Sequence, residues 1–338
     1  MNIFVVTVTY GNRFNLLKQV IDASLSEGVK KVIVVDNASQ EESRKQLQEY
    51  ERSNDKIEVI YLDENLGSAG GYKRGIEEAY NDEECEFIWL LDDDNVPQKG
   101  ALNSLVKFCQ KNSFNPEEVA LLSYREVCHP DYRDAIYEND SSIILGKKNS
   151  FNGFHIVDFQ RKVKKLLRYI FRIKENSHSG GNSKKLTGVV SIGYYGGLFF
   201  HKRLINKIGL PNEEYFTYAD DTEWTYRLIL SGGKIFLLLD SVVEDIEISW
   251  NLAKQGTFSI LSIANGTPFR LYYTMRNRAY FEQRFLVTNR FVYKLNQYTY
   301  LFLIFLLNPK AYKVAKLAIK DAENNHLGKK RESSFFFI

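Results

Sequence analysis

The first hundred residues predict an α/β fold in which a mostly parallel sheet is flanked by helices. Short continuous apolar runs alternate with segments of helical periodicity, and polar clusters follow three of the apolar runs. Continuous apolar strands are typical of parallel sheets that helices cover on both faces. With 338 residues, 44% of them hydrophobic, the chain can bury a sizeable core.

The predicted elements follow one another in a regular order. The expected strands cover residues 3–8, 31–35, 57–62 and 87–91, and the expected helices cover residues 14–27 and 41–53. A further helix includes residues 75–80. Residues 110–185 are polar and strand-poor, and residues 177–183 within them have the composition of a loop.

Three adjacent carboxylates, Asp92, Asp93 and Asp94, directly follow the strand predicted over residues 87–91. Crowding like charges is costly unless a cation lies between them. Asp92 and Asp94 alternate on extended backbone, so both point the same way and can share Mg²⁺ or Mn²⁺. The alternative is an exposed acidic turn.

Two more polar clusters follow strands, at residues 9–13 and 36–39, and we expect all three clusters at one edge of the sheet. Residues 65–75 are rich in glycine and lead into a helix, an arrangement that can hold a diphosphate. A tight turn with close helix packing explains the same glycines equally well.

A second acidic cluster, Asp220, Asp221 and Glu223, precedes residues of helical periodicity. Asp220 is a candidate helix cap. A cap needs one carboxylate, so the excess predicts a general base as well. Upstream, Tyr194 and Tyr195 lie in another segment with glycines, and we expect these tyrosines to be exposed.

Charge and cysteine content narrow the class of protein. A formal net charge of +3 does not indicate a protein that binds nucleic acid over its whole surface. The three cysteines lack the spacing of a zinc finger, and free thiols fit a reducing compartment. The first residues read as a strand rather than a leader, and the apolar run at 301–307 is too short to span a bilayer. We therefore expect a cytoplasmic protein.

Two basic amphipathic stretches, at residues 161–174 and 310–320, have the pattern of helices that lie on a membrane surface. The alternative is a pair of core-facing helices with solvated basic backs. The aromatic run at residues 298–307 favours the membrane interpretation.

The motifs, taken in order, resemble the inverting family 2 glycosyltransferases of GT-A fold. The resemblance covers roughly residues 3–110 and 187–285, and it is strongest to bacterial galactofuranosyltransferases and rhamnosyltransferases. The motifs that carry it are Thr7-Val8-Thr9-Tyr10 with Asn12-Arg13, Val35-Asp36-Asn37-Ala38-Ser39, Asn65-Leu66-Gly67 with Ala69-Gly70-Gly71, Asp92-Asp93-Asp94, Gly196-Gly197-Leu198-Phe199 and Asp220-Asp221-Thr222-Glu223-Trp224.

This resemblance implies a GT-A domain over residues 1–255 and a helical C-terminal region over residues 256–338. Within the domain, residues 1–110 form the donor half, residues 187–255 the acceptor half and residues 111–186 a basic insertion.

The resemblance also implies roles by position. Asp36 reads a pyrimidine base beside Thr9 and Arg13, and Asp221 is the catalytic base. Asp92 helps to hold the ribose and, with Asp94, a Mn²⁺ or Mg²⁺ ion. The remaining donor-binding candidates are Asn65, Gly70, Gly71, Arg74 and Asp93, and the acceptor-binding candidates are Tyr194, Tyr195, Gly196, Asp220, Trp224 and Trp250.

One departure concerns the metal site. Related enzymes complete it with a histidine after the strand that follows the second acidic cluster, and here Asp245 occupies that place. A carboxylate can still bind Mn²⁺ or Mg²⁺, so Asp245 is a candidate ligand. The alternative is a surface acid among Glu244 and Glu247.

The sequence leaves the donor open between UDP-galactofuranose, which the motifs favour, and dTDP-rhamnose. The expected acceptor is a saccharide on a lipid carrier at the inner face of the cell membrane. A sugar nucleotidyltransferase or a nicotinamide oxidoreductase would need a glycine-rich loop after the first strand, where this chain has only Gly11-Asn12-Arg13. A catalytically silent sugar-nucleotide-binding protein is a further alternative, and Asp221 argues against it.

Overall fold

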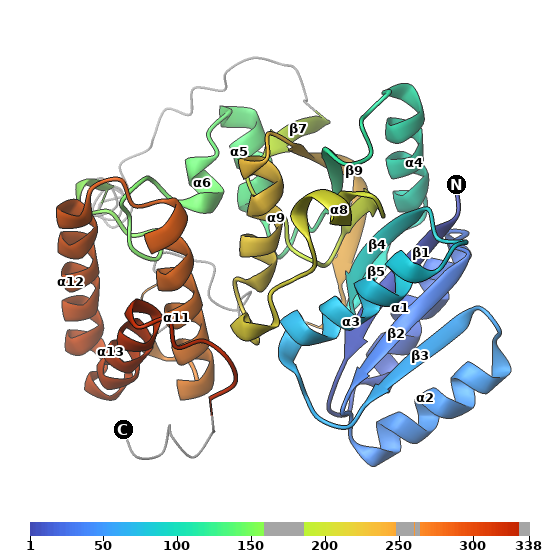
Figure 1. Cartoon of the computed structure of the whole chain (residues 1–338), viewed down its shortest axis with the longest axis horizontal. Coiled ribbons are helices and arrows are strands. Elements are labelled where there is room, and N and C mark those ends of the chain that lie inside the picture. Colours follow the sequence, from blue (N-terminus) through green and yellow to red (C-terminus); the bar gives the residue numbers. More distant parts are fainter. Residues whose placement is uncertain (159–185, 248–259, 261–263, 331–338) are drawn as a thin grey trace, which may run out of the picture. The chain divides into compact units, whose positions relative to one another are not determined.

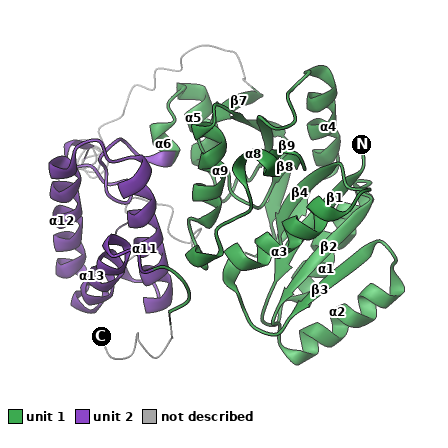
Figure 2. Ribbon diagram, in the orientation of Figure 1, with its two compact units in different colours: residues 1–144, 186–256, 327–330 green, residues 145–185, 257–326, 331–338 purple. Residues whose placement is uncertain are grey.

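The computed structural model describes residues 1–158, 186–247, 260 and 264–330. The chain forms two compact units (Figure 2). Unit 1 comprises residues 1–144, 186–256 and 327–330, and unit 2 comprises residues 145–185, 257–326 and 331–338. The basic helix predicted over residues 161–174, the loop at residues 177–183 and the candidate Trp250 lie outside the described residues.

Unit 1 is built on a nine-stranded sheet, counted over the described residues. The strand order is β3-β2-β1-β4-β8-β6-β9-β5, and β7 pairs with β9. Strands β1 to β4 are parallel, as predicted, whereas β8 runs antiparallel to both β4 and β6. The strands are β1 Ile3–Thr9, β2 Lys31–Asn37, β3 Ile57–Leu62, β4 Phe87–Asp92, β5 Asn95–Pro97, β6 Val119–Tyr124, β7 Thr187–Val190, β8 Leu198–His201 and β9 Lys234–Asp245.

Helices connect these strands and pack against the sheet (Figure 1). They are α1 Phe14–Ser26, α2 Glu41–Ser53, α3 Gly67–Asn81, α4 Ala101–Lys111, α5 Pro130–Glu138, α6 Ser142–Leu145, α8 Leu204–Ile208, α9 Asp220–Leu230 and the 3₁₀ helix η1 Glu213–Tyr215. The alternating order predicted for the first hundred residues is therefore confirmed.

Helix α3 begins earlier than predicted, so the glycine-rich segment forms its first turns. A Cβ on Gly71 would lie 2.5 Å from Val8 Cγ1, and a Cβ on Gly75 would lie 2.4 Å from Val6 Cγ1. These two glycines therefore let α3 approach strand β1 more closely than any other residue would allow.

Strand β6 lies within the strand-poor residues 110–185 and is the one strand that the structure describes there. Residues Val119–Tyr124 pair with β8 on one side and β9 on the other, both more than 70 residues away in the sequence. The run is short and has no hairpin turn beside it, so its local pattern does not separate a strand from a loop.

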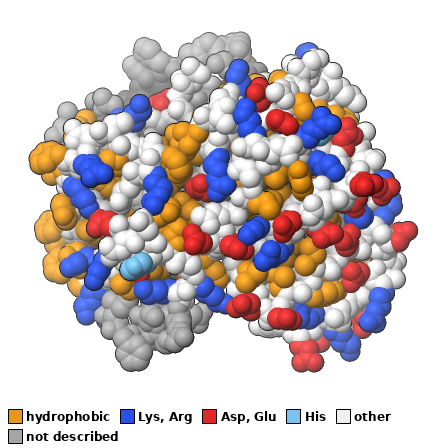
Figure 3. Space-filling model, in the orientation of Figure 1, with side chains coloured by type: hydrophobic (Ala, Val, Ile, Leu, Met, Phe, Trp, Pro, Cys, Tyr) orange, Lys and Arg blue, Asp and Glu red, His pale blue; other side chains and the backbone are white. Residues whose placement is uncertain are grey.

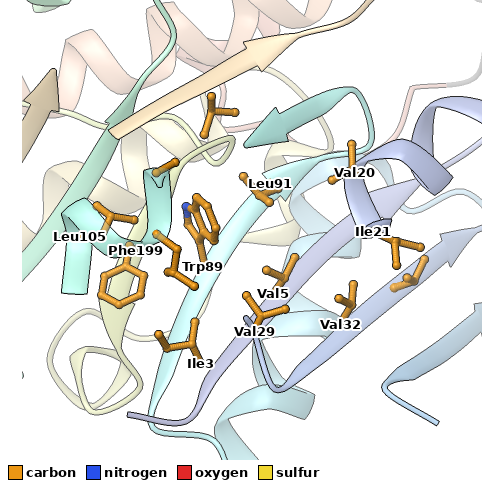
Figure 4. Close-up of a cluster of buried hydrophobic side chains, with 14 of the residues drawn as sticks. Ile3, Val5, Val20, Ile21, Val29, Val32, Trp89, Leu91, Leu105 and Phe199 are labelled. Atoms are coloured by element: carbon orange, nitrogen blue, oxygen red, sulfur yellow. The ribbon is translucent and has the colours of Figure 1, made fainter. Parts of the chain in front are cut away.

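The core of unit 1 contains side chains from strands β1, β2 and β4 together with α1 and α4 (Figure 4). Trp89 is fully buried among them, next to Phe199 of β8 in the register of the sheet. Trp89 therefore packs in the core. This rigid sheet fixes the positions of the residues that follow its strands.

The described part of unit 2 contains three long helices, which confirms the predicted helical C-terminal region. They are α11 Pro268–Phe285, α12 Arg290–Leu307 and α13 Pro309–Glu323. Asn289 accepts a hydrogen bond from Val292 N (3.1 Å), and Asn308 accepts one from Lys310 N (3.1 Å), so side-chain caps start α12 and α13. None of the described helices is long and apolar enough to cross a bilayer.

Candidate active site

The three polar clusters predicted at strand ends meet at one edge of the sheet in unit 1. Thr9 pairs in register with Asp36 of β2, and the neighbouring Val8 pairs with Asp92 of β4. The carboxyl ends of β1, β2 and β4 therefore present their polar residues together, as is usual for ligand sites in α/β sheets.

Asp93 is held firmly by the end of β1 and the start of α1. Thr9 Oγ1 donates a hydrogen bond to Asp93 Oδ2 at 2.8 Å. Arg13 Nε lies 2.8 Å from the same oxygen, and Arg13 NH2 lies 2.9 Å from Asp93 Oδ1. This buried bidentate ion pair fixes the turn after β4, so Thr9, Arg13 and Asp93 position the acidic triplet.

Asp92 and Asp94 lie on either side of this anchor. Tyr72 of α3 donates to Asp92 Oδ1 at 2.7 Å, and Asn95 Nδ2 donates to Asp94 Oδ1 at 3.0 Å. Burial and the charges of Asp92 and Asp93 raise the pKa of Asp94 to about 7. The charge of Arg13 opposes this rise only in part. Negative charge thus accumulates at Asp92 and Asp94, and a cation placed between them would relieve it.

Asp245 faces this cluster and forms an ion pair with Arg125, which directly follows β6. Arg125 Nε lies 3.2 Å from Asp245 Oδ2, and its NH2 group pairs with Asp245 Oδ1. Arg125 NH1 also reaches Asp92 Oδ2 at 3.2 Å. Asn95 donates a further hydrogen bond to Asp245 Oδ1 at 3.0 Å.

In this structure the carboxylate of Asp245 is paired with Arg125, and its role as a metal ligand stays a prediction. Within the described residues, no three His, Cys, Asp or Glu side chains are gathered so as to hold a metal ion. Both oxygens of Asp245 accept hydrogen bonds. The guanidinium of Arg125 supplies the positive charge beside this carboxylate. Asp92 and Asp94 remain as the pair that fits a divalent cation, which commonly takes its other ligands from substrate phosphates and water.

Gly196 lies directly against this cluster. A Cβ at this position would lie 1.8 Å from Asn95 Oδ1, 2.7 Å from Asp92 Oδ2 and 2.8 Å from Arg125 NH1. Any larger residue would displace these groups, so glycine is required for the arrangement. The structure thus places Gly196 beside the acidic triplet.

Asp36 is fully buried at the end of β2. Arg44 Nε lies 2.5 Å from its Oδ2, and Ser39 N donates to its Oδ1 at 2.9 Å. The next residue, Asn37, accepts a hydrogen bond from Leu66 N at 2.8 Å. Asp36 therefore shapes the loop after β2 and holds Arg44.

Asn65 and the glycines beside it build the start of α3. Asn65 Oδ1 accepts a hydrogen bond from Gly67 N at 2.8 Å. A Cβ on Gly70 would lie 2.5 Å from Leu66 Cβ, within the same turn. Arg74, by contrast, is partly exposed and lies 3.5 Å from Glu77 and 3.9 Å from Glu213.

The second acidic cluster starts α9. Ser68 Oγ, in α3, donates to Asp220 Oδ2 at 2.9 Å, and this bond joins α3 to α9. Asp220 does not cap α9, because the helix begins at Asp220 itself and Ala219 occupies the cap position. Ala219 and Tyr218 both have φ in the left-handed region, +60° and +64°. Such strain is frequent at functional sites.

Asp221 has the electrostatic properties of a general base. Burial raises its pKa, the charge of Asp92 raises it too, and a hydrogen bond from Thr222 N at 2.6 Å opposes both. Burial and the charge of Asp221 likewise raise the pKa of Asp220. The charge of Asp92 thus acts on Asp221, although the two residues belong to different acidic clusters.

The expectation that Tyr194 and Tyr195 are exposed is wrong, and the acceptor-binding candidate Trp224 is buried as well. Tyr194 and Tyr195 are only 5% and 4% exposed, and Trp224 is fully buried. Tyr194 stacks on His129 with ring centroids 4.4 Å apart, and Tyr195 stacks on Tyr72 at 4.0 Å. Trp224 Nε1 donates to Gly209 O at 2.8 Å, so Trp224 packs in the core rather than against a sugar.

Sequence reasoning missed three residues that shape the site, Arg125, Tyr72 and Arg44. Tyr72 lies one residue after the predicted glycines, and Arg44 lies in the predicted helix over residues 41–53. The one signal for Arg125 was its place directly after the apolar run that forms β6.

The first part of the chain is similar to known sequences. Residues 4–160 match the sequence profile of Glycosyl transferase family 2. Over 82 residues the chain is 32% identical to TuaG of Bacillus subtilis (strain 168), a protein named as a glycosyltransferase of teichuronic acid biosynthesis. That alignment covers 24% of this chain and 31% of TuaG, so the chain spans less than a third of this relative's length.

Solved structures share the fold. The mannosyltransferase PcManGT of Pyrobaculum calidifontis, solved with GDP-Man and Mn²⁺, aligns with a TM-score of 0.52 at 14% identity, over 99% of this chain and 78% of its own. GalNAc-T7, solved with UDP, GalNAc and Mn²⁺, aligns with a TM-score of 0.53 at 12% identity, over 99% of this chain and 56% of its own. The fold is therefore the GT-A fold.

Proposed function

We propose that this chain, whose residues 4–160 belong to Glycosyl transferase family 2, is an inverting glycosyltransferase that moves a sugar from a nucleotide donor to a saccharide acceptor. The observation that carries the proposal is the convergence of two acidic clusters in unit 1. Asp92 and Asp94 follow β4, and Asp221 starts α9 close enough for the charge of Asp92 to raise its pKa. The cluster after β4 suits a cation that would bind a diphosphate, and the cluster at the start of α9 suits removal of a proton.

The cation is proposed to be Mn²⁺ or Mg²⁺, held by Asp92 and Asp94. Both metals prefer oxygen ligands, and the raised pKa of Asp94 shows that its negative charge is only partly compensated by Arg13 and Arg125. When bound, such an ion would stabilise negative charge on the diphosphate that leaves the donor. Arg125 is proposed to keep Asp92 and Asp245 in place.

Asp221 is proposed to accept the proton of the acceptor hydroxyl as that oxygen attacks the anomeric carbon. The bond from the anomeric carbon to the diphosphate oxygen breaks as the new glycosidic bond forms, so the configuration inverts. A positioned general base typically contributes about 10²–10⁴-fold in rate. Asp220, held by Ser68, is proposed to orient the start of α9.

UDP-galactofuranose is the proposed donor, with dTDP-rhamnose as the alternative. The support is the sequence pattern of the Asp92–Asp94 triplet, the Ala69-Gly70-Gly71 segment and Asp220-Asp221-Thr222-Glu223. The name of TuaG supports a role in the synthesis of cell-surface polysaccharide. The proposed acceptor is a saccharide on a lipid carrier, and the proposed location is the inner face of the cell membrane.

The test is release of nucleoside diphosphate from a panel of donors by the purified protein with Mn²⁺. The panel contains UDP-galactofuranose, dTDP-rhamnose, UDP-galactopyranose and UDP-glucose. We expect metal-dependent turnover of one donor and its loss in Asp221→Asn. Thermal shift with each donor and metal separates binding from turnover, and a protein that binds none of the four would overturn the proposal.

A further inference from the structure

Helix α12 of unit 2 exposes apolar side chains along one face. Of the fifteen large hydrophobic residues that are exposed in the described part of the chain, seven lie in this helix. Phe291 is 79% exposed, Tyr298 64% and Leu306 62%. We call the following residues the α12 stripe: Phe291, Leu295, Tyr298, Phe302, Phe305 and Leu306.

From Phe291 to Phe305 the members of the α12 stripe are three or four residues apart, and Leu306 follows Phe305 directly, so the stripe lies on a single face of the helix. In a helix that simply covers a core, this apolar face would point inward. Here it points to solvent, while the opposite face buries Tyr300, Leu301 and Ile304, so α12 carries apolar side chains on both faces. Singly exposed apolar residues need no explanation, but a continuous row of them marks an interaction surface.

The opposite face of α12 is held inside unit 2 by polar contacts. Asn296 is fully buried, where its Nδ2 donates to Asn149 O at 2.8 Å and its Oδ1 accepts from Ile156 N at 2.9 Å. The Tyr300 hydroxyl accepts a hydrogen bond from Asn152 Nδ2 at 2.8 Å. Because buried polar groups that lose their partners are costly, rotation of α12 to hide the stripe is disfavoured.

Positive charge lies beside the stripe on helix α13. Lys310, Lys313, Lys316 and Lys320 are all exposed, whereas Asp321 is buried. The two helices meet where the Phe305 ring contacts the Tyr312 ring, with centroids 5.4 Å apart, and Lys316 Nζ lies 5.7 Å from the Tyr312 centroid. In Figure 3, hydrophobic side chains and Lys or Arg side chains reach the surface together over α12 and α13.

We propose that the α12 stripe and the α13 lysines dock unit 2 on the surface of an anionic lipid bilayer, an inference that rests on the proposed position of the enzyme at a membrane. An apolar face with aromatic residues enters the boundary between head groups and acyl chains, while flanking lysines attract anionic head groups. A second copy of this chain is a less suitable occupant, because pairing two stripes would bring two lysine rows together.

The first experiment is sedimentation of the full chain with vesicles of phosphatidylcholine alone and of phosphatidylcholine with phosphatidylglycerol. We expect binding to the anionic vesicles that weakens as salt is raised. The variant Phe291→Ser/Phe302→Ser/Phe305→Ser should weaken binding at least about 100-fold, because it removes the apolar area that enters the bilayer. Changing the four lysines to Gln should cost about 100-fold and remove the dependence on salt.

The matched control is Leu230→Ser, which changes a residue of unit 1 that is also exposed. It should bind vesicles as the unchanged protein does. A second measurement uses Phe302→Trp, whose fluorescence should shift to the blue on anionic vesicles. All α12 variants should release nucleoside diphosphate from soluble donor at the unchanged rate, so failure of docking is separable from failure of the proposed reaction.

Two results would overturn the inference. The first is equal vesicle binding by the unchanged protein and the triple Ser variant, or no binding by either. The second is a dimer, seen by light scattering, that the triple Ser variant converts to a monomer, since a second copy of the chain would then occupy the stripe.

Discussion

The two acidic clusters of unit 1 have similar sequences but opposite surroundings. In the triplet after β4, Arg13 pairs with Asp93 and lies 3.3 Å from Asp94, and Arg125 pairs with Asp92. At the start of α9, the named contacts of Asp220 and Asp221 are a hydroxyl and a backbone N–H rather than an ion pair. Charged partners hold the triplet in a fixed geometry, whereas hydrogen bonds from neutral groups hold Asp220 and Asp221.

This difference separates cation binding from base chemistry. Burial raises the pKa of Asp221, and so a proton can be gained and lost near neutral pH. Asp93, which is more deeply buried, is bound by a guanidinium on both oxygens and is suited to a structural role. Acidic residues in this chain therefore differ in function because of what donates hydrogen bonds to them, and four experiments test that distinction.

The largest expected effect is on turnover in Asp221→Asn. The amide keeps the size and the hydrogen bond from Thr222 N but cannot accept the proton, so kcat should fall by about 10²–10⁴-fold with little change in donor affinity. The matched variant is Asp220→Asn, which should lose less than about 10-fold in kcat. The reverse order of the two losses would assign the base to Asp220 instead.

The second effect is on stability, in Asp93→Asn. This change leaves the partly buried guanidinium of Arg13 without its main partner, and we expect the free energy of unfolding to fall by about 3 kcal/mol. Arg13 keeps Glu247 and Asp94 as partners, which places the loss at the low end for a buried pair. Denaturant unfolding measures it.

The control for this change is Asp22→Asn, which breaks the exposed pair with Lys18. A surface pair of this kind contributes at most about 0.5 kcal/mol. Equal losses in the two variants would remove the distinction between an anchoring carboxylate and a surface one.

The third effect concerns Mn²⁺ in Asp94→Asn. If Asp92 and Asp94 hold the ion, the dissociation constant of Mn²⁺ should rise at least about 10-fold, because even outer partners of a metal typically contribute that much. Asp245→Asn should leave Mn²⁺ affinity within about 3-fold, since Arg125 already engages that carboxylate. Electron paramagnetic resonance of free Mn²⁺ measures both dissociation constants. A larger loss of Mn²⁺ affinity in Asp245→Asn than in Asp94→Asn would assign Asp245 as a ligand.

The sequence predicted the elements that depend on local pattern. Strand β3 was predicted at its observed bounds, and the convergence of Thr9, Asp36 and Asp92 followed from the rule that parallel strands end at one edge. Residue periodicity and strand order are enough to predict where a strand lies and which strand ends meet.

The parts that were missed depend on contacts between distant segments. Arg125 reaches the site because β6 inserts between β8 and β9, a pairing that local pattern does not encode. Tyr194 and Trp224 were expected near the acceptor, but His129 and Gly209, from other parts of the chain, bury them. Burial of an aromatic residue is decided by its tertiary neighbours, and for that reason a motif alone could not assign it.

The smallest effect is the pH dependence that Asp221 should impose on kcat/KM. Burial and the charge of Asp92 raise the pKa of Asp221 to about 6, and only the ionised form accepts a proton. Activity should therefore be level above that pH and fall as pH decreases through it, by about 10-fold for each further pH unit. Asp221→Asn should lose this limb while keeping a low, pH-independent rate. An acid limb centred near pH 4 would show that Asp221 keeps an ordinary carboxyl pKa, and the contrast between the two clusters would then lie in geometry rather than in protonation.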